Sequence, residues 1–171
     1  GVMEVLDYLA RYKHSPIAGL VLIDNSIGEG QPPSSGKSSS KSQAPVKDRA
    51  AYLKDFTLGL TKKPMPRGLY DTIFASASRM PRSVAQDLVN KPYPREYWRD
   101  TLLKQKVPIL YMIRPRFQEQ GRILAAKRPT LARVEVFPEA GHALFIDEPE
   151  KFNRILSQFA QKTWANPCNV R

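Results

Sequence analysis

The stretch that best indicates the fold of this chain is Phe137-Pro138-Glu139-Ala140-Gly141-His142-Ala143-Leu144-Phe145-Ile146-Asp147-Glu148-Pro149-Glu150-Lys151-Phe152. The preceding run, 132–137, alternates small or apolar with charged side chains, as a strand does. The following run, 149–164, has apolar residues at helical spacing. His142 is therefore expected on a turn, permitted by Gly141, at the carboxyl end of a strand, where open α/β sheets place their ligands. An imidazole there can act as a catalytic base.

The rest of the chain predicts alternating helices and strands. A helix starts at Val2 and ends before Pro16, and residues 17–23 form an apolar run that predicts a strand buried on both faces. Residues 107–113 predict a second buried strand, and 117–127 a helix with Ile123 and Leu124 facing inward. The fold class is therefore α/β, with a parallel sheet flanked by helices. Three strands are few for such a sheet, so we expect it to be incomplete.

Two segments interrupt this alternation. Residues 27–47 are rich in Gly, Pro, Ser and Lys, a composition that predicts a flexible loop. The run from Gly30 to Ser38 within it resembles a phosphate-binding loop, but five residues separate its glycines instead of four, Pro33 lacks an amide donor, and no apolar helix follows. We therefore expect no nucleotide site and no other cofactor. Residues 48–105 predict short helices separated by prolines, whose apolar stripes suit core packing or the lining of an apolar pocket.

Composition excludes several classes of protein. The longest apolar run has seven residues, far below the roughly 20 that cross a bilayer. The single cysteine, Cys168, cannot form an internal disulfide, so cysteine usage does not indicate whether the protein works in an oxidising or a reducing compartment. Cys168, His14 and His142 offer no metal-ligand cluster, so no metal is expected. The net charge of +11 is spread along the chain without a nucleic-acid-binding motif. We expect no nucleic-acid partner; the oligomeric state is left open.

The order of these pieces resembles the carboxyl-terminal half of an α/β-hydrolase. Residues 1–9 resemble the helix after the nucleophile elbow, 19–25 and 107–111 resemble the next two strands, and Ala140-Gly141-His142 with Phe145, Pro149 and Phe152 is the most specific match. The resemblance implies a hydrolase core over 1–26 and 106–171, with a helical cap over 48–105. It also implies that Gly1 is the last glycine of the elbow, so that the nucleophile serine and the missing amino-terminal half lie outside this chain.

The acid of the implied catalytic triad has two candidates. The family's usual position is the turn after Ile113, which here contains Arg114-Pro115-Arg116 and no aspartate; its only nearby carboxylate is Glu119. In some hydrolases of this kind, such as haloalkane dehalogenases, the acid follows the preceding strand, where this chain has Asp24. We prefer Asp24, because it ends an apolar strand on the same sheet edge as His142. Asp147 and Glu148 are expected to open the last helix, and His14 to be a surface residue.

The resemblance implies hydrolysis of carboxylic esters or related acyl substrates, with His142 as the base and no hydrolase activity in this polypeptide alone. Haloalkane dehalogenase chemistry is disfavoured. The alternative is a non-catalytic hydrolase-like domain whose basic surface binds an acidic partner; the Arg114-Pro115-Arg116 turn favours this alternative, and the intact Gly141-His142 pair opposes it.

Overall fold

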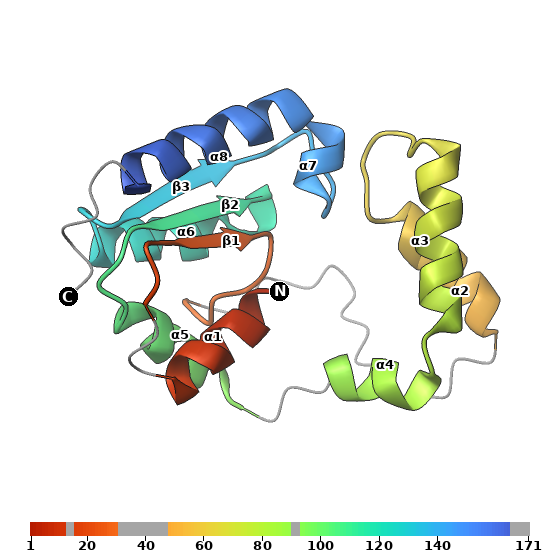
Figure 1. Cartoon of the computed structure of the whole chain (residues 1–171), viewed down its shortest axis with the longest axis horizontal. Helices are drawn as coiled ribbons and strands as arrows, with labels where there is room; N and C mark the ends of the chain where they lie inside the picture. The colour runs from red at the N-terminus through yellow and green to blue at the C-terminus, as the bar shows by residue number, and fades with distance from the viewer. Residues whose placement is uncertain (13–15, 31–47, 90–92, 165–171) are drawn as a thin grey trace.

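The sheet of the computed structural model has three parallel strands in the order β1-β2-β3 (Figure 1). The structure describes residues 1–12, 16–30, 48–89 and 93–164; His14, Cys168 and most of the expected loop over 27–47 lie outside them. The strands are β1 (Leu20–Ile23), β2 (Ile109–Ile113) and β3 (Ala132–Val136). In register, Leu22 lies opposite Tyr111, and Tyr111 lies opposite Val134. The predicted parallel α/β architecture is confirmed.

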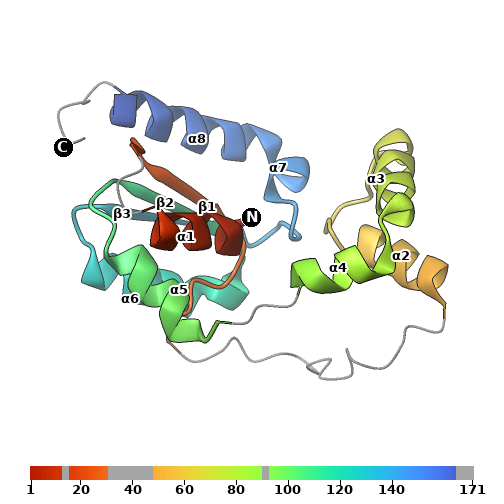
Figure 2. The ribbon, with the colours of Figure 1, turned by 60° about the horizontal axis from the view of Figure 1, so that its bottom comes forward.

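Helices cover both faces of this sheet. They are α1 (Val2–Arg11), α5 (Arg95–Leu103), α6 (Gln118–Lys127), preceded by the 3-10 turn η1 (Pro115–Phe117), and α8 (Pro149–Trp164). In Figure 2, α8 lies on one side of the sheet, and α1, α5 and α6 lie on the other. The short helix α7 (Leu144–Asp147) leads into α8.

Strand β2 is the centre of the core, because all five of its residues are buried. Successive strand side chains point to opposite faces, so Ile109, Tyr111 and Ile113 join the cluster under α1, α5 and α6. Leu110 and Met112 join the second cluster, under α8. Two apolar layers thus hold β2 between them, and β1 and β3 pair with β2 so that the three strands end at the same edge of the sheet.

Strand β1 differs in part from its sequence-based prediction. It starts at Leu20, three residues later than expected, and it is not buried on both faces, because Val21 is 37% exposed. The physical reason for the exposure of Val21 is the position of β1 at the edge of the described sheet, where β2 is its one partner among the described strands.

Three helices stand apart from the sheet in both views of the ribbon (Figures 1 and 2): α2 (Arg49–Leu58), α3 (Arg67–Arg79) and α4 (Arg82–Val89). Their apolar stripes are not core packing, since Tyr52 and Phe56 are each more than half exposed and no residue of α3 is buried. By contrast, α5 packs against α1 and buries Trp98 and Leu102 in the core. The region expected as a cap thus divides between three helices that lie away from the sheet (Figure 1) and a core helix.

Within the described residues, no helix is both long and apolar enough to cross a membrane.

Candidate functional site

The carboxyl ends of the three strands bring together side chains that lie far apart in the sequence. Asp24 follows β1 directly, and its backbone N–H extends the parallel ladder by donating to Met112 O at 2.8 Å. Arg114 follows β2, and His142 lies on the turn between β3 and α7. Parallel strands end at one edge of a sheet, and that edge carries the site.

Asp24 occupies an uncommon backbone conformation. Its φ of 41° lies in the left-handed region, which Asp tolerates better than most residues other than glycine. Its side chain is fully buried. Tyr111 supports the turn that follows, since its hydroxyl donates to Asn25 O at 2.7 Å, and burial raises the pKa of this phenol.

The buried carboxylate of Asp24 binds two cationic or potentially cationic groups. Arg114 donates its backbone N–H to Oδ1 at 3.0 Å, and its Nε and Nη2 each lie 2.7 Å from Oδ2. Nδ1 of His142 lies 2.8 Å from the same Oδ2. An ionised carboxylate can only accept hydrogen bonds, so Nδ1 of a neutral His142 donates, and Nε2 keeps its lone pair. The imidazole side chain is 49% exposed, and this leaves it accessible to a reacting group.

The other acid candidate does not reach the imidazole. Glu119 lies in the first turn of α6, and its carboxylate accepts from Nε and Nη2 of Arg122 at 2.9 and 2.7 Å. The Arg122 guanidinium lowers the pKa of this exposed carboxyl. The structure therefore brings together His142 and Asp24, and not His142 and Glu119.

Sequence reasoning overlooked Arg114 as a partner of the acid. In the sequence, the Arg114-Pro115-Arg116 turn indicated a missing aspartate and favoured a basic, non-catalytic surface, yet its first residue binds the carboxylate that lies at the end of the neighbouring strand. The sequence did contain a signal for this contact, because Asp24 and Arg114 each directly follow one of two adjacent parallel strands.

Asp147 is also placed differently from its prediction. It does not open the last helix, because α8 begins at Pro149 and Asp147 ends α7. Glu148 does precede α8, where its carbonyl accepts from Phe152 N. Asp147 is 2% exposed, and its carboxylate accepts from three backbone N–H groups, those of Gly141, Lys62 and Lys63.

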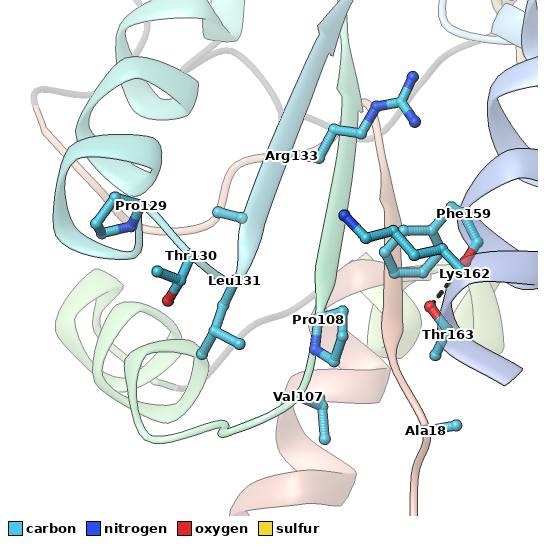
Figure 3. Close-up of a pocket in the computed structure, with 11 residues that line it drawn as sticks. Ala18, Val107, Pro108, Pro129, Thr130, Leu131, Arg133, Phe159, Lys162 and Thr163 are labelled. Atoms are coloured by element: carbon cyan, nitrogen blue, oxygen red, sulfur yellow. Dashed lines mark hydrogen bonds between the residues drawn. The ribbon is translucent and has the colours of Figure 1, made fainter. Parts of the chain in front are cut away.

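Within the described residues, no serine hydrogen-bonds to His142, and no group of three potential metal ligands occurs. A cavity of about 360 Å³ lies at the opposite edge of the sheet, beside Pro108, Leu131 and Thr163, which precede β2 and β3 and end α8 (Figure 3). It lies at the amino-terminal edge of the strands, away from Asp24 and His142, so we do not assign it to this site.

Three solved structures share this fold. A candidate aryl esterase from Burkholderia cenocepacia superposes with a TM-score of 0.74 at 22% identity, over 96% of this chain and 62% of that one. The esterase EaEST from Exiguobacterium antarcticum gives 0.68 at 23% identity, over 94% and 63% of the two chains. Est816, described as an N-acyl homoserine lactone degrading enzyme, gives 0.60 at 19% identity, over 92% and 63%.

The chain thus spans less than two thirds of the length of each of these structures. No family model and no curated protein sequence matches it. At these identities the likeness establishes the fold alone, and it agrees with the resemblance found in the sequence. The chain has an α/β-hydrolase-like fold, shared with these esterases.

Proposed function

We propose that this chain supplies the base and the acid of a serine-type hydrolase acting on carboxylic esters or related acyl substrates. The observation that carries the proposal is the 2.8 Å contact between Nδ1 of His142 and Oδ2 of the buried Asp24, at the carboxyl edge of the sheet. Two of the structural neighbours are described as esterases and the third as an N-acyl homoserine lactone degrading enzyme, and these descriptions support the same reaction class.

In this proposal His142 transfers protons through Nε2. That nitrogen takes the proton from a serine hydroxyl as the oxygen attacks the ester carbonyl, and it later protonates the leaving alcohol. Asp24 holds the ring by its Nδ1–H and stabilises the imidazolium. Arg114 binds Asp24 from the other side, which limits the rotation of its carboxyl group.

The nucleophile is proposed to come from a segment outside this chain, the amino-terminal half of the same fold. The outer edge of β1, which pairs with no strand of the described residues, supports this, because apolar side chains gather beside it. Val21 is 37% exposed and Val5 is 40% exposed, and both line a hollow of about 400 Å³. A further strand placed there would bury them. The helices α2 to α4, which lie away from the sheet, are proposed to cap an apolar acyl or alcohol pocket. This polypeptide alone is then expected to hydrolyse no ester.

The alternative is a non-catalytic domain whose basic surface binds an acidic partner, and the basic turn after β2 is the feature that favours it. Arg114 of that turn is engaged with Asp24, and this use of the charge weakens the case for a separate acidic partner.

The test uses the complete protein that contains this chain and short p-nitrophenyl esters. His142→Ala should lower kcat by about 10² to 10⁴-fold, the usual contribution of a general base. His14→Ala, which changes the other histidine of this chain, is the matched control and should keep the activity. Equal hydrolysis by the wild type and His142→Ala would exclude the proposed base.

A further inference from the structure

Asp147 carries a buried carboxylate for which the proposed chemistry has no role. It lies six positions after Gly141, with 2% of its surface exposed. Oδ2 accepts from the N–H of Gly141 at 2.6 Å and from that of Lys62 at 2.8 Å, and Oδ1 accepts from the N–H of Lys63 at 2.9 Å. One side chain thus joins the turn that holds His142 to a segment about 85 positions away.

That segment, 60–63, connects α2 to α3 and lies directly against the His142 turn. Leu60 O accepts from Ala143 N at 2.8 Å, so both neighbours of His142 in the chain are bonded within this contact. The approach is close enough to require glycine at position 141, because a Cβ there would lie 2.7 Å from Lys62 N. The ammonium of Lys63 adds a contact to Asp147 O at 2.6 Å.

The direction of the imidazole depends on this backbone. The His142 side chain is 49% exposed, so packing restrains it little, and among the residues that the structure describes its ring bonds to Asp24 alone. A small rotation of the turn would move Nδ1 away from Oδ2, because hydrogen bonds weaken steeply with distance and angle. The buried Asp147 carboxylate, with its three N–H donors, opposes that rotation through charge-assisted hydrogen bonds.

We propose that Asp147 is a positioning residue: it ties the His142 turn to segment 60–63, so that the connection between α2 and α3 holds the imidazole against Asp24. The catalytic value of this arrangement rests on the proposed hydrolase function. The positioning itself does not, and it can be measured without turnover.

The experiment compares Asp147→Asn with Glu139→Gln in the complete protein. Asparagine keeps one acceptor oxygen but turns an NH₂ group toward backbone donors. Glu139→Gln removes the exposed ion pair to Lys62 at 2.7 Å, which joins the same two segments, and it is therefore the matched control. The readouts are the ring-nitrogen NMR signals of His142, identified by their disappearance in His142→Gln, and amide hydrogen exchange.

Asp147→Asn should speed exchange at Gly141, Lys62 and Lys63 by at least about tenfold, as expected when hydrogen bonds to a charged group are lost. Exchange in β2 should stay slow. The His142 signals should change from those of a ring that donates through Nδ1 to those of a ring averaging between tautomers, and Glu139→Gln should change neither readout.

Unchanged His142 signals in a folded Asp147→Asn protein would overturn the proposal, as would equal effects from Glu139→Gln.

If Asp147→Asn does not fold, Gly141→Ala tests the same contact with the carboxylate intact. It should expose the amides of Lys62 and Lys63 and alter the His142 signals; unaltered signals would again overturn the proposal. If the wild type hydrolyses no ester while these effects appear, the hydrolase proposal fails and the positioning role stands. In an active protein, Asp147→Asn should lower kcat and leave KM unchanged.

Discussion

Nδ1 of His142 lies 2.8 Å from Oδ2 of Asp24, although 118 positions separate the two residues in the chain. The same oxygen accepts from the guanidinium of Arg114, so one buried carboxylate lies between a permanent cation and an imidazole. Asp24 is fully buried, so the hydrogen bonds to these partners offset the cost of removing its carboxyl group from water. This relationship leads to the first two predictions.

Replacing the acid should separate the two carboxylate candidates. Asp24→Asn keeps the shape and the tolerance for positive φ, but it can favour the wrong tautomer of His142, so we expect kcat on p-nitrophenyl esters to fall by about 10³ to 10⁴-fold. Glu119→Gln should stay within about twofold of the wild type, because Glu119 pairs with Arg122 on the surface. Steady-state kinetics of the complete protein measure both variants. A larger loss in Glu119→Gln than in Asp24→Asn would reverse the assignment of the acid.

Removing Arg114 should affect the free energy of unfolding more than it affects kcat. Arg114→Gln leaves the fully buried Asp24 without its strongest partner, and we expect the free energy of unfolding to fall by about 3 kcal/mol. Arg116→Gln is the matched control two positions away: Arg116 contacts the Phe117 ring at 4.9 Å, and its loss should cost less than about 1 kcal/mol. Urea unfolding followed by circular dichroism gives both values. Equal costs would mean that the contact between Arg114 and Asp24 adds little.

Acid should destabilise the protein in part through Asp147. Burial opposes ionisation of this carboxyl, but the N–H groups of Lys62, Gly141 and Lys63 and the charge of Lys63 outweigh it and hold its pKa below the usual value. A lowered pKa in the folded state stabilises the fold above the unfolded pKa, and this stability is lost as pH falls through the folded pKa. The wild type should therefore lose stability below about pH 4.

Urea midpoints measured from about pH 7 to about pH 3 test this, with Asp147→Asn as the comparison. The variant should be less stable at neutral pH, and its midpoint should fall less steeply on the acid side. Parallel curves for the two proteins would contradict the prediction.

Gly28, in the loop that follows Asp24, should not tolerate a side chain. Its φ is 80°, and a Cβ would lie 2.2 Å from the carbonyl oxygen of Arg95, so Gly28→Ala should cost roughly 2 to 4 kcal/mol. Gly68→Ala is the control, because a Cβ there meets nothing within 4 Å and the helix α3 gains up to about 1 kcal/mol. Thermal unfolding measures the difference. A Gly28→Ala protein as stable as the wild type would show that the loop can move away from α5.

The prediction of the fold was most accurate where local pattern decides the structure. The apolar spacing of α1 and α8 and the short apolar run at β2 predicted these elements within a few residues. The pattern left open what the apolar stripe of α2 contacts: Tyr52 and Phe56 have helical spacing there, and each is more than half exposed. Periodicity identifies a helix and its apolar stripe, but it does not say what packs against that stripe.

The candidate site was predictable in outline from two facts, a histidine on a turn after one strand and an aspartate at the end of another. The sequence by itself determined the alternation of helices and strands and the expected placing of Asp24 and His142 at one sheet edge. Backbone periodicity is a local property, and strands connected through helices run parallel, so that their carboxyl ends meet at one edge. Only the tertiary structure decided that Arg114 shares the carboxylate of Asp24, and that Asp147 binds the backbone of segment 60–63. Hydrogen bonds between segments about 85 to 118 positions apart depend on the folded arrangement of the whole sheet edge, which no local pattern encodes.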